Sequence, residues 1–251
     1  MSLSRFHLSA SEWQPDQLTL MGDEAAHCAR VLRRNVGDAI EIFDGQGRVA
    51  TGAITGLSKS AVKVRVDELK QHESRGQEIH LLPAMIKAEP FEWLLEKATE
   101  LGAASVRPVI TARTVVHLSG EHLDKKLHKW QRHMIESAKQ CHTPWVPALE
   151  RPRAFTDLVS KLPAESTRLI PALSEHSRRL HEISFSAARP IFILIGPEGD
   201  FTDEEEAAAQ EAGFQAITLG PLILRAETAA IATLAMVGHE VARQGAVKAG
   251  V

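Results

Sequence analysis

Two short apolar runs near the carboxyl end of the chain, each ended by a Gly-Pro pair, constrain its fold more than any other feature. The runs are Ile191–Ile195 and Ala216–Leu219, and the pairs stand at 196–197 and 220–221. Short runs rich in β-branched residues are typical of strands buried on both faces. Glycine tolerates positive φ and proline donates no hydrogen bond, so each pair marks an abrupt turn. A helical pattern follows each turn, which predicts two loops at the carboxyl ends of parallel strands, where open α/β sheets bind ligands.

The pattern of predicted secondary structure changes near residue 73. Before it, Asp44–Gly47 separates two strand-like runs and predicts a hairpin, Ala61–Val66 alternates as a half-exposed strand does, and Glu24–Arg34 reads as a helix. The polar segment Lys70–Gln77 is a plausible linker. After it, strand-length apolar runs alternate with amphipathic helices, which indicates a parallel sheet covered by helices. We therefore expect a small β-barrel with one helix over residues 1–73 and an α/β domain over residues 74–251.

Composition excludes several classes of protein. Of the 251 residues, 44% are hydrophobic and 24% charged, as in a globular protein with a real core. Because no run of about 18 apolar residues occurs and the amino end lacks an apolar signal core, we expect a cytoplasmic protein without a membrane span. The two cysteines, Cys28 and Cys141, predict no disulfide there. The formal net charge of -3 means that any RNA-binding surface must be local.

The histidines and cysteines do not indicate a metal site. His117, His122, His128 and His133 cluster in sequence, but their spacing does not place them on one helical face. Neither H-E-x-x-H nor C-x-x-C occurs, so we expect no metal. The G-x-S-x-G elbow of hydrolases, the G-x-G-x-x-G of dinucleotide folds and the P-loop are also missing from the sequence.

The first glycine loop, Gly196–Gly199, is followed by a strongly acidic helix start. Thr202 and Glu205 match a capping box, and three carboxylates fall in the first turn. These carboxylates would repel a phosphate at a helix end where anions usually bind. The loop therefore suits a ligand that is neutral or positive where it meets the protein. A plain turn before a well-capped helix explains the same residues equally well.

The second loop leads into polar residues at the start of an apolar helix. Arg225, Glu227 and Thr228 directly precede Ala229–Val237, which reads as a buried helix. Polar side chains at the mouth of a buried helix either pair with each other or line a site. The commoner explanation is a structural ion pair between Arg225 and Glu227. The presence of two glycine loops on neighbouring strand ends favours a site.

The two loops together carry a family resemblance. GPEGDFTDEE at 196–205, followed by LGPLILRAETAA at 219–230, resembles the bacterial 16S ribosomal RNA (uracil-N3)-methyltransferases of the SPOUT superfamily. The resemblance implies an N-terminal PUA-like RNA-binding β-barrel, a C-terminal SPOUT α/β domain with a deep trefoil knot, and a homodimer. It also implies S-adenosylmethionine as cofactor and N3 of a uridine in 16S ribosomal RNA, within the small subunit, as substrate. The family usually has glycine where Asp200 stands and a basic residue where Leu222 stands.

The resemblance also implies roles for individual residues. Arg225 is expected to stabilise negative charge on the uracil oxygens, and Glu227 to orient Arg225 or relay the N3 proton. The base must be unpaired or flipped to expose N3. The residues expected to bind the cofactor, from three loops, are Leu173, Gly196, Pro197, Glu198, Gly199, Leu219, Gly220, Leu224, Ala226 and Thr228.

A basic run in the N-terminal helix is the expected RNA contact. His27, Arg30 and Arg34 recur at spacings that share one face of an α-helix, with Arg33 beside them. Family members have a similar H-x-x-x-V-L-R run, which favours phosphate contacts. The alternative is a solvated basic helix end, where the helix dipole favours arginine in any case.

Two other functions are compatible with the same sequence. One is a non-enzymatic RNA-binding ribosome assembly factor that keeps the fold without the chemistry. The other is a methyltransferase of the same fold that acts on transfer RNA ribose or a guanine. Calorimetric binding of S-adenosylmethionine separates the first from an enzyme, and mapping of the methylated nucleosides separates the second.

Overall fold

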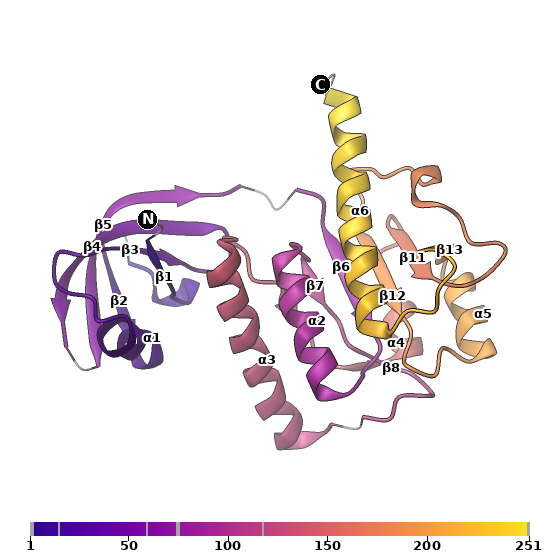
Figure 1. The fold of residues 1–251 in the computed structure, drawn as a ribbon, viewed down its shortest axis with the longest axis horizontal. Helices are drawn as coiled ribbons and strands as arrows, with labels where there is room; N and C mark the ends of the chain where they lie inside the picture. The colour runs from indigo at the N-terminus through magenta and orange to yellow at the C-terminus, as the bar shows by residue number, and fades with distance from the viewer. Residues whose placement is uncertain (1–2, 15, 59, 74–75, 117, 250–251) are drawn as a thin grey trace. The chain divides into compact units, whose positions relative to one another are not determined.

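The structure, a computed structural model, describes residues 3–14, 16–58, 60–73, 76–116 and 118–249 (Figure 1). It divides into two compact units. The first comprises residues 1–75 together with 138–146, and the second comprises residues 76–137 and 147–251. Within the described residues, no helix combines the length and the apolar character that a membrane crossing requires.

The first unit is built on a five-stranded sheet. Its strands are β1 (Ser4–His7), β2 (Gln17–Met21), β3 (Ala39–Phe43), β4 (Arg48–Leu57) and β5 (Ala61–Gln71), in the order β1-β3-β4-β5-β2. β1 pairs with β3 in parallel, and the other pairs are antiparallel. The predicted hairpin is confirmed as the β3–β4 turn, where Asp44 Oδ1 accepts the N–H groups of Gln46 and Arg48 at 2.7 and 2.9 Å. A short 3₁₀ turn, η1 (Ala10–Glu12), follows β1.

The predicted helix over Glu24–Arg34 is wrong in its extent and its geometry. The structure has α1 at Gly22–Ala26, followed by a π-helical turn, η2, at His27–Val31. The amide of Leu32 donates to the carbonyl of His27 at 3.0 Å, one residue further back than in an α-helix. Arg33 then adopts a φ of 50°. Because the helix ends at Val31, the argument that His27, Arg30 and Arg34 share one α-helical face does not hold.

A segment from the middle of the chain completes the first unit. Residues 138–146 include the last turn of α3 (Gly120–Cys141) and the loop after it. The guanidinium of Arg5 donates to the carbonyl of Ala138 at 3.1 Å, and the amide of Val146 donates to the carbonyl of Gly45 at 2.9 Å. Trp145 packs over Gly47, where even a methyl group would lie 2.4 Å from the indole ring. The compact unit is therefore not continuous in sequence, in contrast to the expected division at residue 73.

The second unit is a six-stranded parallel sheet flanked by helices, as the alternating pattern predicts. Its strands are β6 (Ile79–Pro83), β7 (Ser105–Val106), β9 (Ala148–Leu149), β11 (Thr167–Pro171), β12 (Ile191–Ile195) and β13 (Gln215–Ile217), in the order β13-β11-β12-β6-β7-β9. Every neighbouring pair is parallel. Two short strands, β8 (Val109–Ile110) and β10 (Arg153–Ala154), pair separately.

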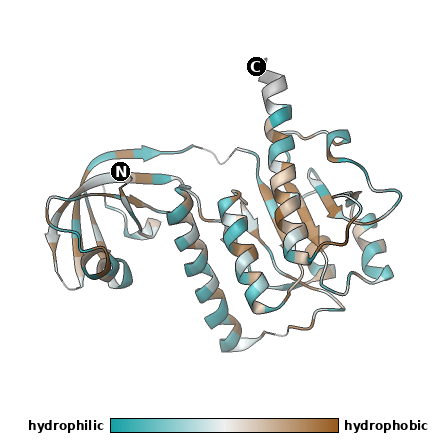
Figure 2. Ribbon diagram, viewed as in Figure 1, coloured by the Kyte–Doolittle hydropathy of each residue, from teal (hydrophilic) through white to brown (hydrophobic). Residues whose placement is uncertain are grey.

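Helices cover both faces of this sheet. The helices that follow β6 in the chain are α2 (Ala88–Glu100), α3, which packs on α2 through Trp130 and Phe91, α4 (Phe155–Val159), α5 (Asp203–Glu211) and α6 (Ala226–Ala249), with a 3₁₀ turn η3 (Leu180–Glu182). α6 packs on α2, β6 and β12. On the other face, Phe192 and Leu194 of β12 join a core with α4 and α5. Every residue of β12 is buried, as expected of a two-faced strand. Figure 2 shows the apolar first half of α6, in contrast to the hydrophilic α3 and α5.

This topology brings the carboxyl ends of four strands to one edge of the sheet. The strands β6, β11, β12 and β13 are parallel neighbours, so their carboxyl ends and the loops after them lie together. The loop after β12 holds the first Gly-Pro pair, and the loop after β13 holds the second. The trefoil knot stays a prediction.

Candidate functional site

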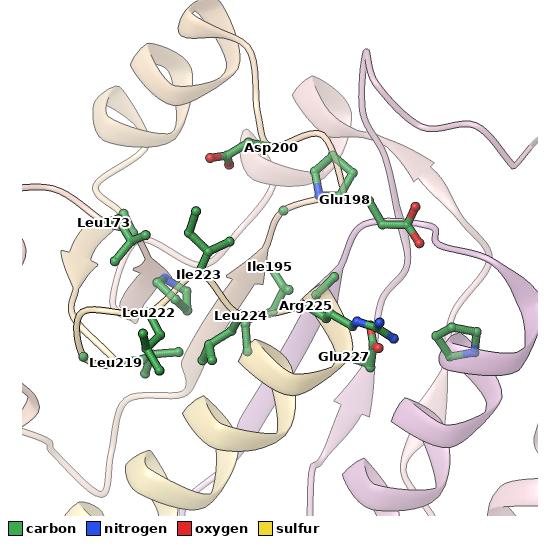
Figure 3. A pocket seen from close by; sticks show the side chains of 18 of the residues that line it. Leu173, Ile195, Glu198, Asp200, Leu219, Leu222, Ile223, Leu224, Arg225 and Glu227 are labelled. Carbon is green, nitrogen blue, oxygen red and sulfur yellow. The ribbon is translucent and has the colours of Figure 1, made fainter.

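A cavity of about 740 Å³ lies at this edge of the sheet. Three loops of the sequence converge on it: Pro171–Leu173 after β11, residues 195–200 after β12, and residues 219–229 after β13 (Figure 3). Lys87, directly before α2, and Pro90, in the first turn of α2, add a fourth wall. The three loops expected from the sequence thus meet around one space.

The cavity has an apolar side and a charged side. Leu173, Leu219, Leu222, Ile223 and Leu224 gather on the apolar side, whereas Glu198, Arg225 and Glu227 lie on the other (Figure 3). At the charged rim, Lys87 Nζ lies 3.9 Å from Glu198 Oε2. Leu222 and Ile223 are 73% and 88% exposed. Side chains of this size stay exposed at a cavity mouth where a ligand or partner can cover them.

The residues of the first glycine loop form hydrogen bonds with one another around Asp200. Asp200 adopts a φ of 64°, the left-handed conformation that aspartate tolerates better than most residues. Its amide donates to the carbonyl of Pro197 at 2.9 Å, and its Oδ1 accepts the amide of Phe201 at 2.9 Å. Asp200 also lines the cavity. Asp200 thus adopts a left-handed conformation at the position expected to be glycine.

The capping box of α5 is confirmed. Thr202 Oγ1 accepts the amide of Glu205 at 3.2 Å, and Glu205 Oε2 accepts the amide of Thr202 at 3.1 Å. The first turn of α5 carries Asp203, Glu204, Glu205 and Glu206. The terminus is therefore more acidic than an anion site allows.

Two residues expected to contact the cofactor lie outside the cavity lining. Gly199 and Thr228 are missing from it, whereas the other eight expected cofactor residues all line it. A Cβ at Gly199 would face the side chain of Arg113, at 3.5 Å from Cδ, rather than the cavity. Thr228 is exposed on the first turn of α6. α6 begins at Ala226, so its 3.6-residue turn points Glu227 and Thr228 in different directions.

Arg225 and Glu227 both line the cavity, but they do not form a structural ion pair. Within the part of the chain that the structure describes, neither side chain has an ion pair or a hydrogen bond. The carbonyl of Arg225 accepts the amide of Ala229 at 2.8 Å, which fixes the backbone of Arg225 at the start of α6. The guanidinium is exposed at the cavity and has its donors available for a ligand.

The residues expected to contact RNA separate into two groups. Arg30 and Arg33 are exposed, without a hydrogen bond or ion pair among the described residues. Arg34 donates to Ser4 Oγ at 2.5 and 3.1 Å, and the half-buried ring of His27 packs edge-on against Phe6, with centroids 6.1 Å apart. Arg30 and Arg33 are thus the free cations of the expected patch, which we call the Arg30–Arg33 surface.

Several cavity residues are missing from the set that the sequence indicates. They are Lys87, Pro90, Pro171, Ala172, Ile195, Asp200, Leu222, Ile223 and Ala229. Most are neighbours of indicated residues on the same loops. Lys87 and Pro90 follow β6, and they reach the cavity because β6 pairs with β12. The sequence does not show this strand pairing, so the only local signal for these two residues is the end of the apolar run before them. No group of three metal-ligating side chains occurs among the described residues.

Comparison with known proteins shows which proteins the chain resembles. The profile of an RNA methyltransferase domain matches residues 72–238, and that of an RNA methyltransferase PUA domain matches residues 20–67. The ribosomal RNA small subunit methyltransferase E of Synechocystis is 30% identical over 88% of this chain and 72% of its own. That of Bacillus subtilis is 27% identical over 95% and 97%.

Two solved structures resemble the whole chain. A methyltransferase of Legionella pneumophila, in complex with S-adenosylmethionine, matches with a TM-score of 0.87 and 31% identity, over 95% of this chain and 98% of that one. A ribosomal RNA small subunit methyltransferase E of Neisseria gonorrhoeae, bound to S-adenosylmethionine, matches with a TM-score of 0.85 and 30% sequence identity. The match covers 95% of this chain and 98% of that one.

Proposed function

The chain belongs to the RNA methyltransferase family, with a PUA domain followed by a methyltransferase domain of SPOUT type, and we propose that it methylates N3 of a uridine in the 16S ribosomal RNA of the small subunit. It is an enzyme that uses S-adenosylmethionine. The observation that carries the finer proposal is the two-sided cavity at the strand ends. An apolar side and a side with a free arginine beside a carboxylate meet there.

The residues around the cavity fit this cofactor. Leu173, Leu219 and Leu224 offer an apolar bed for the flat adenine ring, and the glycine loops bring backbone groups to the same space. The acidic first turn of α5 disfavours a phosphate and tolerates a positively charged ligand. When bound, S-adenosylmethionine supplies a methyl group on a positively charged sulfur.

The charged side of the cavity supplies what a uracil imide needs. N3 becomes nucleophilic only as its proton leaves, and negative charge then spreads to the two ring oxygens. Arg225, with no other partner among the described residues, offers a planar fork of donors for one of those oxygens. Glu227 lies on the same side of the cavity and is our candidate to take the N3 proton.

The remaining partners belong to the same proposal. The Arg30–Arg33 surface of the PUA domain offers phosphate contacts. Ala235 and Met236 of α6 are exposed on a largely apolar helix, which supports a homodimer across this face. A protein that modifies ribosomal RNA works in the cytoplasm, where the small subunit is assembled.

The test is methyl transfer by the purified protein. Small-subunit RNA lacking its natural modifications, free or within assembled subunits, is incubated with S-adenosylmethionine that carries a heavy methyl group. Digestion and mass spectrometry then identify the labelled nucleoside. We expect a single N3-methyluridine, and a comparison of the two substrates shows which form of the RNA is used.

Other outcomes would redirect the proposal. A labelled ribose or a labelled guanine would keep the enzyme class and overturn the assignment to uracil N3. Tight RNA binding without cofactor binding in calorimetry would indicate an RNA-binding assembly factor instead.

A further inference from the structure

Arg113 reaches the first glycine loop from a different part of the chain. Its Nη1 donates to the carbonyl of Gly199 at 2.6 Å and to the carbonyl of Phe201 at 3.0 Å. The two acceptors are the residues on either side of Asp200. One guanidinium nitrogen therefore binds the carbonyls on both sides of Asp200, the residue of this loop that lies in the left-handed conformation.

The conformation of Asp200 is one that needs support. Asp200 has a φ of 64°, which an L-residue other than glycine adopts at a cost in backbone energy. If Asp200 relaxed to a negative φ, the carbonyls of Gly199 and Phe201 would turn and the loop would leave its present path. Because Gly196, Pro197, Glu198 and Asp200 all line the cavity, the wall would move with it.

The segment that carries Arg113 is itself fixed. Thr111 and Thr114 are buried, and the amide of Thr111 donates to Thr114 Oγ1 at 2.9 Å. The amide of Ala112 donates to Glu205 Oε1 at 2.8 Å. The other oxygen of Glu205 caps α5. Residues 111–114 are thus anchored to the start of α5, which directly follows the loop, and this anchoring fixes the backbone that carries Arg113.

We propose that Arg113 is a positioning residue for the cofactor: it holds the loop from Gly196 to Phe201 in the conformation that binds S-adenosylmethionine. The inference rests on the proposed function of the cavity. Without the guanidinium, only a fraction of molecules would keep the competent loop, and the apparent dissociation constant would rise in inverse proportion to that fraction. Arg113 need not touch the cofactor for this effect.

The experiment is calorimetric titration of the full-length protein with S-adenosylmethionine and with S-adenosylhomocysteine. The variants are Arg113→Ala, Arg113→Lys and, as a matched control, Arg151→Ala. Arg151 makes an exposed ion pair with Asp124 at 2.5 Å, so its variant removes the same group from a surface contact of the same unit. Thermal midpoints are measured without and with cofactor.

We expect Arg113→Ala to bind both ligands about tenfold more weakly, the change in affinity that ~1.4 kcal/mol produces. Arg113→Lys should fall between the alanine variant and the wild type, because an ammonium satisfies one carbonyl but not both in a fixed geometry. Arg151→Ala should match the wild type. Without cofactor, all midpoints should agree within a few degrees, and the gain on adding cofactor should be smallest for Arg113→Ala.

Several results would overturn the inference. These are wild-type affinity in Arg113→Ala or an equal loss of affinity in Arg151→Ala. A large fall in the cofactor-free midpoint of Arg113→Ala, with wild-type affinity in a folded Arg113→Lys, would make Arg113 a scaffold residue. If the wild type itself bound neither ligand, the proposed function would fall, and this inference with it.

Discussion

At the scale of single residues, the proposed chemistry depends on Arg225. Its side chain lines the cavity without an ion pair or hydrogen bond to any described residue, so the protein does not already use its donors. A guanidinium that meets the uracil oxygens only as charge develops contributes mainly to the transition state. Arg225→Ala should therefore lower the single-turnover methylation rate by about 10²–10³, the scale of one oxyanion donor. Affinity for cofactor and RNA should change much less.

Two controls accompany this variant. Arg225→Lys should restore part of the rate, because lysine offers a point charge in place of a planar fork. The cofactor-free thermal midpoint of Arg225→Ala should equal that of the wild type, since no folding contact of the side chain is lost. An early-melting variant that methylates at the wild-type rate when folded would instead place Arg225 in the scaffold.

His7 gives a prediction about pH. Burial lowers the pKa of His7, and hydrogen bonding at Asp44 and the charge of Glu24 oppose the shift only in part. The ring packs edge-on against Phe43, with centroids 5.3 Å apart. The unfolded chain thus takes up a proton at His7 at a higher pH than the folded protein does. This contribution to stability is complete above the unfolded pKa of about 6.5 and is lost as the pH falls below it.

The measurement is urea unfolding between pH 8 and pH 5, for the wild type and for His7→Gln. Glutamine cannot titrate in this range, so the variant should lose less stability on acidification than the wild type does. Parallel curves for the two proteins would mean that His7 does not contribute to the acid sensitivity.

At the scale of elements, the π-helical turn η2 decides which basic side chains are free. Arg34 is engaged with Ser4, whereas Arg30 and Arg33 are exposed. Arg30→Glu combined with Arg33→Glu should weaken RNA binding and flatten its salt dependence by roughly one unit of slope for each lost phosphate contact. Arg65→Glu on β5, where Arg65 pairs with Asp67 at 2.9 Å, is the matched control and should change the slope less.

Measuring cofactor affinity in the same variants shows whether their loss of RNA binding is specific to RNA. This affinity should be the same in all of these variants, because the cavity is lined only by residues of the second unit. A salt slope in the double variant equal to that of the wild type would mean that the surface is merely solvated.

At the scale of the whole molecule, the structure makes the first unit depend on residues 138–146. Gly47 lies at the contact with this segment: its φ is 101°, and a Cβ there would meet Trp145 at 2.4 Å and the carbonyl of His72 at 2.9 Å. Gly47→Ala should lower the free energy of unfolding by about 1–3 kcal/mol, through overpacking and an unfavourable φ.

Gly56→Ala is the matched control for this variant. Gly56 lies in β4, the strand that begins directly after Gly47, and a Cβ there would sit at an ordinary 3.6 Å from the side chain of Lys63. Its stability in urea should stay within about 0.5 kcal/mol of the wild type. Trp145→Ala should relieve part of the cost of Gly47→Ala, and additive effects of the two changes would argue against the contact.

Much of the fold and of the cavity could be read from the sequence. The strand over Ile191–Ile195 is confirmed at both ends, and the predicted capping box is present. The three expected loops line one cavity. These features succeed because they depend on residues close in the chain, whose periodicity and turn chemistry are legible without knowledge of the rest. The helix over Glu24–Arg34 failed because a π-helical turn leaves no clear trace in an α-helical spacing.

What the sequence by itself determined is therefore local: the buried strand Ile191–Ile195, the Gly-Pro turns, the capped helix, and the polar residues at the start of α6. The second expected strand, Ala216–Leu219, is instead the half-buried edge strand β13 at Gln215–Ile217. Only the tertiary structure decided that Arg113 binds the carbonyls on both sides of Asp200, that Lys87 joins the cavity, and that residues 138–146 complete the first unit. The physical reason is that these contacts join residues 86 or more positions apart. Such pairs are brought together by the order of the strands and the paths of the loops. The sequence around each residue does not indicate which distant residue it will contact.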